Sequence, residues 1–272
     1  AILSTRRIET RSDRLVTIAV LPMMSCAGRL PIYMMFVSAL FPSRLQAPVL
    51  FGIYASGVLL ALCCARLLKN TLFKAPQRDS LHHMKRLRLP SLRKVGILMW
   101  SRAFMYVRKA GTFILGASII LWFLNTYPRP EENTAPTNAA AMEHSYAGQI
   151  GHWMEPVTQV AGFDWKINSA LVGAFAAKEI FVTQMGILYA VEDGNSVPAA
   201  QQTLNARLKA SYTPLQGISI MIFCLIALPC IGTVTVAKRE AGTWWFALAQ
   251  FGGLTLLGFA TATLIYQTGL LL

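Results

Sequence analysis

Long apolar stretches constrain the fold of this chain more than any other feature of its sequence. A helix needs about 20 mostly apolar residues to cross the hydrocarbon core of a bilayer. These stretches lack the period-two alternation of β-barrel strands, and backbone polar groups in lipid must bond internally, so helices are expected. The sequence therefore predicts an all-α polytopic membrane protein with about six membrane segments. The candidate segments are residues 15–41, 49–68, 110–127, 167–190, 215–237 and 243–272.

Charge placement decides between a membrane and a nucleic-acid interpretation of the net charge of +13. Residues 66–109 carry twelve Lys or Arg against one acid, Asp79, and lie between two apolar stretches. This is the placement that the positive-inside rule gives a cytoplasmic loop, so we expect contact with the lipid bilayer and no nucleic-acid partner. From about Ser91 the loop is either an amphipathic helix on the anionic inner leaflet or a solvated segment. Residues 128–166, with one Arg and five acids, are expected to form an external loop.

Prolines interrupt two of the apolar stretches, at Pro22 and Pro229. Simple crossing by all six segments would place the basic residues 237–240 outside, against the charge rule, so we expect broken or re-entrant helices here. A proline inside a helix removes its own N–H donor and clashes with the carbonyl four residues back. The carbonyl oxygens of Ile18 and Leu225 are therefore expected to become free ligands.

Sulfur-containing side chains follow both prolines. Cys26 comes after Pro22, with Met24 between them, and Cys230 directly follows Pro229. Thiolate and thioether groups are soft ligands that suit transition metals better than Mg²⁺ or Ca²⁺. We expect Cys26, Cys230 and Met24 to be metal ligands on a cation path; the alternative is a pair of kinked helices that merely contain cysteine.

Two adjacent charges, Lys178 and Glu179, interrupt the apolar stretch 167–190. A charge at the centre of a membrane helix costs about 2.5–3.5 kcal/mol on insertion scales, so such residues often mark a transport pathway. The alternative is a structural ion pair with Arg29. We expect Arg29 to brace the break at Pro22, either by bonding freed carbonyls or by pairing with Glu179.

Motifs of soluble nucleotide-binding proteins and of metalloproteases are absent from the sequence. It contains no G-x-x-x-x-G-K-[ST], no G-x-G-x-x-G and no H-E-x-x-H. A membrane enzyme with a histidine-bound metal is a weak alternative, because His82 and His83 form the only adjacent pair among four histidines. His144 and His152 are interpreted as surface residues. The chain is therefore not expected to be an enzyme.

Three segments carry a resemblance to a known family. The segments "ILSTRRIETRSDRLVTIAVLPMMSCAGRLPIYMMFVSALFP", "AAKEIFVTQMGILY" and "ALPCIGTVTVAKRE" resemble the C-terminal membrane region of ferrous iron transport protein B, in order through nearly the whole chain. The resemblance implies a GTP-linked importer of Fe²⁺ in the bacterial inner membrane, in which Cys26 and Cys230 fall on cysteines proposed to handle iron. It also implies a permease core over residues 1–127, an external loop over 128–166, and a second gate segment with a terminal helix over 167–272.

The resemblance further predicts which parts and partners would lie elsewhere. GTP would be bound only by an N-terminal GTPase domain upstream of Ala1, which makes this chain a fragment. A small cytoplasmic protein of the same iron-transport system is an expected partner, and a homo-oligomer stays open. The second hypothesis is a gate-type permease for another solute, such as a nucleoside. Convergence of Asn168, Ser169 and Gln184 on one polar site would favour it.

Overall fold

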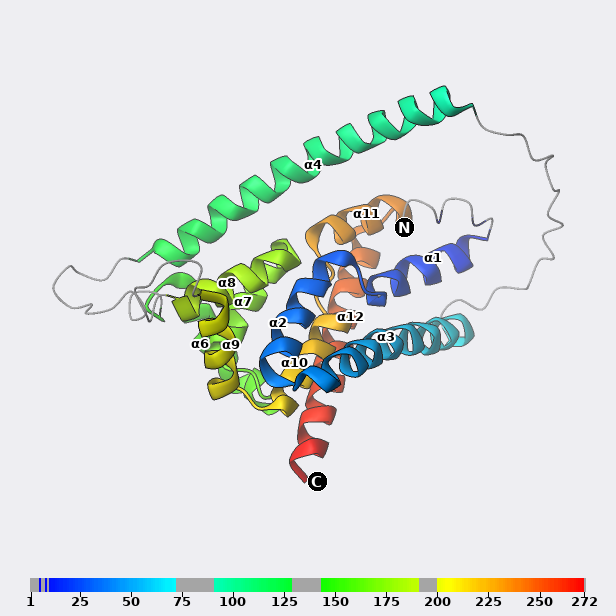
Figure 1. Ribbon diagram of the computed structural model, residues 1–272. Helices are drawn as coiled ribbons and strands as arrows, with labels where there is room; N and C mark the ends of the chain where they lie inside the picture. The colour runs from blue at the N-terminus through cyan, green and yellow to red at the C-terminus, as the bar shows by residue number, and fades with distance from the viewer. Residues whose placement is uncertain are drawn as a thin grey trace.

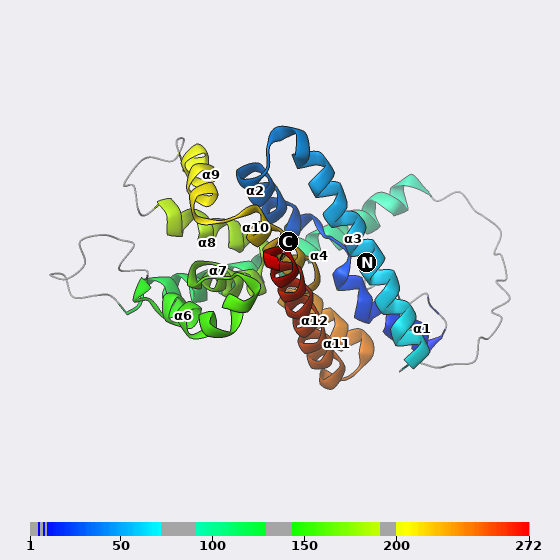
Figure 2. The ribbon, with the colours of Figure 1, turned by 90° about the horizontal axis from the view of Figure 1, so that it is seen from below.

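All regular elements in the described part of the chain are helices, which confirms the predicted fold class. The computed structural model describes residues 5, 8, 10–71, 91–128, 143–190 and 200–271. Figure 1 shows the long helix α4 along one side of the molecule, apart from most of the other helices. Seen from below, α12 and α11 lie side by side in the middle, between the group α6–α9 and the pair α1 and α3 (Figure 2).

The first proline-containing stretch is broken, as predicted. Helix α1 (Arg11–Val20) ends where Pro22 enters a short 3-10 helix, Leu21–Met23. A second 3-10 helix, Ala27–Arg29, leads into α2 (Leu30–Leu40). We call residues 21–29 the first break. The chain then reverses into α3 (Ser43–Thr71), which packs against both α1 and α2.

The second half of the basic region is helical, which is one of the two alternatives predicted for it, and the region predicted as an external loop contains a helix. Part of the basic region and the apolar stretch 110–127 form one continuous helix, α4 (Leu92–Thr126). The region expected to be an external loop contains α6 (Tyr146–Thr158), whose first turn is capped by Ser145 Oγ. His82 and His83 lie outside the described residues.

The apolar stretch 167–190 was expected to be one helix interrupted by charges, and that expectation was wrong. It forms two helices, α7 (Trp165–Ala176) and α8 (Lys178–Ala190). Ala177 between them is extended, with φ −150° and ψ 134°. We call this residue the second break; Lys178 therefore begins a helix and does not lie in the middle of one. Helix α9 (Ala200–Ser211) follows.

The second proline-containing stretch is also broken, as predicted. Helix α10 (Pro214–Ile226) starts with a capping box between Thr213 and Gln216, and α11 (Ile231–Ala241) starts after Cys230. We call residues 227–230 the third break. The left-handed Gly242, at φ 83°, ends α11 and lets α12 (Trp244–Leu271) fold back against both α11 and α10.

Four helical stretches in the described part of the chain are long and apolar enough to cross a membrane. The sequence prediction of about six segments differs from this number; residues 110–127 lie within α4, and residues 167–190 form two shorter helices. The four stretches are Arg11–Leu40, Ser43–Thr71, Pro214–Ala241 and Trp244–Leu271. Two of them contain a break, so this chain is a helical membrane protein with discontinuous helices.

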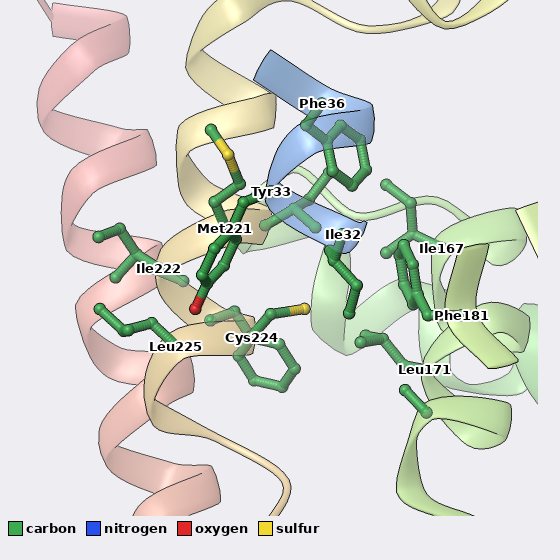
Figure 3. Close-up of a cluster of buried hydrophobic side chains, with 14 of the residues drawn as sticks. Ile32, Tyr33, Phe36, Ile167, Leu171, Phe181, Met221, Ile222, Cys224 and Leu225 are labelled. Carbon is green, nitrogen blue, oxygen red and sulfur yellow. The ribbon is translucent and has the colours of Figure 1, made fainter. Parts of the chain in front are cut away.

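Helix α10 forms the centre of the core. Its residues from Ile220 to Ile226 are all buried. In Figure 3, Met221 and Cys224 of α10 lie beside Tyr33 and Phe36 of α2, with Phe181 of α8 on the far side. Because core interiors are close-packed, this cluster fixes the positions of the helix ends that surround it.

A hydrogen-bond chain joins α7, α8 and the start of α10. Tyr189 Oη donates to Tyr212 Oη at 3.2 Å, and Tyr212 Oη donates to Asp164 Oδ2 at 2.8 Å. Asp164 also caps α7, because its Oδ1 accepts from Ile167 N at 2.9 Å. Burial raises the pKa of Asp164, although these hydrogen bonds partly oppose the shift.

The raised pKa of Asp164 predicts a pH dependence of stability. From the unfolded value of about 3.9 up to the folded pKa, the folded state binds more protons than the unfolded state, so the unfolding free energy falls as pH rises. Asp164→Asn removes this titration. We expect the thermal midpoint of wild type, measured in detergent micelles, to fall relative to that of Asp164→Asn as the pH rises from about 4 through the raised pKa of Asp164. A constant difference over this range would contradict the prediction.

Candidate functional site

The three helix breaks lie next to one another. The 3-10 helix Ala27–Arg29 of the first break contacts α8, and a Cβ atom placed on Gly28 would lie 2.7 Å from Glu179 Oε1. The side chain of Lys178, directly after the second break, reaches the third break. The candidate site is therefore a junction of three places where backbone leaves the helical hydrogen-bond pattern, as in the ion sites of discontinuous helices.

Lys178 caps the carboxyl end of α10. Its Nζ donates to the carbonyl oxygens of Cys224 at 3.0 Å and Ala227 at 3.2 Å, and the residue is only 6% exposed. The last carbonyls of a helix lack intrahelical partners and carry the negative end of its dipole. A cation is therefore well placed at this end of α10. The contact of Lys178 with α10 could not be predicted from its place next to Glu179 in the sequence.

Three cysteines belong to the segments that meet here. Cys26 lies in the first break, Cys230 ends the third break, and Cys224 lies in the last turn of α10, where its carbonyl oxygen accepts from Lys178. Cys26 is exposed, Cys230 is half-buried with its Sγ 3.2 Å from Thr233 Oγ1, and Cys224 is buried. In Figure 3 the thiol of Cys224 points from α10 toward Ile32 of α2.

Cys224 packs in the hydrophobic core, where its side chain is buried. The contact made by its backbone carbonyl was not predicted. Its spacing before Pro229 was the available signal: a residue in the last turn before a proline break has a carbonyl without a helical partner. In the structure that carbonyl binds Lys178.

Arg29 is 2% exposed and braces the first break through a backbone carbonyl. Its Nη1 donates to Met24 O at 3.3 Å. No ion pair joins Arg29 to Glu179, although both residues lie in the described part of the chain, and Glu179 is exposed. Two contacts were expected for Arg29. The structure contains the hydrogen bond to a backbone carbonyl, that of Met24, and does not contain the ion pair with the Glu179 carboxylate.

The carbonyl freed by Pro22 is not a free ligand, contrary to expectation. Gln250 of α12 donates from Nε2 to Ile18 O at 2.7 Å and to Ala19 O at 3.3 Å. An orphan carbonyl in a buried position costs about 1–3 kcal/mol, which explains why a side chain from a distant helix satisfies it. The contact joins residues more than 200 positions apart, so local sequence could not reveal it.

Other polar groups and backbone angles mark the breaks as irregular. Ser25 Oγ, Arg29 Nε and Tyr33 Oη are buried without a protein hydrogen-bond partner. Met24 is 52% exposed and Met23 is buried. Leu228, directly before Pro229, has a φ of 53°, a left-handed conformation that costs a residue with a Cβ about 1–2 kcal/mol. Strain of this kind gathers at functional sites.

The thiols do not form a metal centre of their own in this conformation. Within the described residues, no three His, Cys, Asp or Glu side chains are arranged to hold a metal ion. Soft ligation at this junction would therefore combine a thiol with backbone carbonyl oxygens.

The residues that would favour another solute do not converge. Asn168 donates to Gly151 O and to Thr158 Oγ1, and so joins α7 to α6. Gln184 and Asn125 exchange two hydrogen bonds of 2.9 Å between α8 and α4, and Ser169 is buried. His152 is partly exposed, stacks on Trp165 and pairs with two glutamates.

A cavity of about 850 Å³ lies between α4 and the second and third breaks. Its walls include Leu121 and Leu124 of α4, Phe175 and Ala176 of α7, and Ile231 at the start of α11. Ile231 is the residue that follows the third break.

Two family models match this chain. The model described as "Ferrous iron transport protein B C terminus" matches residues 50–102, and the gate model described as "Nucleoside recognition" matches residues 107–244. No solved structure matches the chain.

Several curated proteins are similar to the chain over most of its length. A "Fe(2+) transport protein A/Fe(2+) transporter FeoB fusion protein" of Porphyromonas gingivalis is 35% identical, covering 100% of this chain and 36% of the relative. A "Fe(2+) transporter FeoB" of Campylobacter jejuni is 36% identical, covering 92% and 41%. The protein of that name from Methanocaldococcus jannaschii is 34% identical, covering 100% and 40%.

The chain thus spans about two fifths of the length of these relatives. The two family models together match most of residues 50–244, and the relatives cover nearly all of the chain. The discontinuous apolar helices are consistent with a membrane transporter family. This chain belongs to the ferrous iron transport protein B family.

Proposed function

We propose that this chain is the membrane part of a transporter that moves Fe²⁺ across the bacterial inner membrane through the junction of the three breaks. The single observation that carries the proposal is the meeting of the three breaks, with Cys26 in the first break and Cys230 in the third. Relatives that span this chain are named Fe(2+) transporters. Fe²⁺ is the substrate of this activity and not a resident cofactor.

The chemistry of the junction suits a dehydrated divalent ion of intermediate softness. Carbonyl oxygens replace water around the ion, and a thiolate adds a ligand that Mg²⁺ and Ca²⁺ bind poorly. A cysteine must lose its proton to bind a metal, so each coordinating thiol releases one proton as the ion arrives. Pro22 and Pro229 would keep the helices open, with Met24 and Glu179 on the exposed side.

The remaining parts of the transporter belong to the same proposal. The relatives are more than twice as long as this chain, which leaves room for a GTPase domain that would link GTP to transport. The Porphyromonas relative is a fusion with Fe(2+) transport protein A. We propose a small protein similar to Fe(2+) transport protein A as a partner of the transporter that contains this chain.

Uptake of radiolabelled Fe²⁺ under anaerobic conditions tests the function. The intact protein is expressed in bacteria without other ferrous importers, as wild type, Cys26→Ser or Cys230→Ser. We expect each serine variant to lose about 90% or more of the uptake, because a hydroxyl is a poor ligand for a soft ion. Cys63→Ser is the matched control, since Cys63 lies exposed on the regular helix α3 and outside the three breaks in sequence, and it should retain uptake. Full uptake without Cys26 and Cys230 would reject the thiol path.

A nucleoside permease is the second candidate, and one observation favours it. The gate model, described by nucleoside recognition, covers residues 107–244. The same cells can be offered radiolabelled nucleosides. Uptake of a nucleoside without uptake of Fe²⁺ would support this candidate, although Asn168 and Gln184 are already bonded to protein groups.

A further inference from the structure

We propose that the Lys178 ammonium is a tethered cation, which occupies carbonyl ligands of the third break in the resting state and which the transported ion must displace. The inference rests on the proposed function and adds a residue that controls entry. Lys178 would compete with the ion for the same oxygens, so that the two positive charges exclude one another.

The geometry of the contact is that of a bound cation. The ammonium lies on two carbonyl oxygens, Cys224 O at 3.0 Å and Ala227 O at 3.2 Å, at the negative end of α10. Unwound carbonyls and helix carboxyl ends are the groups that coordinate cations in discontinuous membrane helices. The ammonium thus holds the place that a coordinated ion would take on the carbonyl oxygens of Cys224 and Ala227.

The charge at this position has no acid to balance it. Among the described residues, no carboxylate lies within the 4.0 Å ion-pair distance of the Lys178 ammonium, and the nearby Arg29 adds a second positive charge. A buried charge without a partner is expensive unless its surroundings compensate it. The carbonyl dipoles and the thiols are the compensating groups on hand.

The first break shows that a charge is not needed to satisfy the carbonyls. There, the neutral amide of Gln250 donates to Ile18 O and Ala19 O, again two carbonyls at the end of a broken helix. Lys178 makes the equivalent pair of hydrogen bonds at the third break, but with an ammonium. The two breaks therefore differ in the donor, which is a neutral amide at the first break and an amine that can carry a positive charge at the third.

A tethered cation would keep the junction closed to other cations. Two like charges held close together in a protein interior repel one another, and the repulsion from a divalent ion is twice that from a monovalent one. An ion can enter only if its ligands, including a thiolate, offset the displacement of Lys178. The device would discriminate against hard ions that gain little from sulfur.

Binding of Co²⁺ to the purified intact protein tests the inference. Co²⁺ binds nitrogen, oxygen and sulfur sites more tightly than Fe²⁺, so it is a sensitive probe. The variants are Lys178→Gln, which retains a donor for the carbonyls but loses the charge, and Lys178→Arg, which retains the charge. Lys209→Gln, on the exposed side of α9, controls for the loss of one positive charge elsewhere.

We expect Lys178→Gln to bind Co²⁺ at least about tenfold more tightly than wild type, and Lys178→Arg and Lys209→Gln to bind no more tightly. Adding Cys230→Ser to Lys178→Gln should remove the gain, which locates the ion at the third break. An equal gain in the Gln and Arg variants, or no gain in a folded Lys178→Gln protein, would overturn the inference.

A second measurement needs no variant. Saturating Co²⁺ should raise the reaction of Lys178 with a small acylating reagent in wild type, as measured by mass spectrometry, because the displaced ammonium leaves its buried carbonyls. Unchanged acylation at saturation would refute displacement. The two proposals fail separately: a gain of Co²⁺ binding without Fe²⁺ uptake rejects iron transport, whereas uptake without displacement rejects only the tethered cation.

Discussion

Gly258→Val is expected to detach α12 from the third break and to destabilise the membrane region by about 3 kcal/mol. A Cβ atom at Gly258 would lie 2.7 Å from Ala227 Cβ, 3.0 Å from Ala227 N and 3.3 Å from Ala227 Cα. Two of these three atoms are backbone, so no rotation of a side chain can relieve the clash. Because Ala227 belongs to the third break, which is part of the proposed ion path, we also expect the loss of Fe²⁺ uptake.

Gly253→Val is the matched control on the same helix. A Cβ atom at Gly253 would meet no atom within 4 Å. Valine there should leave the thermal midpoint in detergent within about 2 °C of wild type, since surface changes rarely exceed about 0.5 kcal/mol. Gly258→Val should lower the midpoint by about 6–12 °C. Equal midpoints for the two variants would show that α12 does not approach the break as closely as the structure has it.

Asp164→Ala is the second change with a large expected effect. It removes the cap of α7, worth about 1 kcal/mol, and leaves the buried Tyr212 hydroxyl without its acceptor, which costs about 1–3 kcal/mol. We expect a destabilisation of about 2–4 kcal/mol, measured as the thermal midpoint of the intact protein in detergent. The loss should be smaller at high pH, where the wild-type carboxylate is itself disfavoured by burial.

Two variants separate the contributions of Asp164. Asp164→Asn retains an oxygen that can cap Ile167 N, and should recover the capping part of the loss. Tyr212→Phe removes the hydroxyl that bonds Asp164 and Tyr189, and should retain the cap. If both variants were as damaging as Asp164→Ala, the two hydrogen bonds would not be independent, and the chain of three residues would act as one unit.

The helical class and two of the three breaks could be predicted from local sequence. Apolar length identifies membrane helices, and proline acts on its own helix turn, so Pro22 and Pro229 fixed where α1 and α10 end. Both properties are local. The resemblance in three segments also gave the family, since it depends only on the order of residues.

The second break, at Ala177, could not be predicted in the same way. Nothing in the letters around Ala177 breaks a helix, because alanine has the highest helix propensity. Its extended conformation places Lys178 at the start of α8, from where the ammonium reaches α10. Burial of that charge on carbonyls of another helix outweighs a local preference of less than about 1 kcal/mol per residue.

The sequence by itself determined the kind of fold, the family and the sulfur beside each proline. Tertiary structure alone decided what each broken end binds: Gln250 at the end of α1, Met24 O for Arg29, and Lys178 at the end of α10. The physical reason is that an orphan carbonyl in a buried site must be satisfied, while any donor that packing brings within reach can satisfy it. Which donor arrives depends on how distant helices pack together.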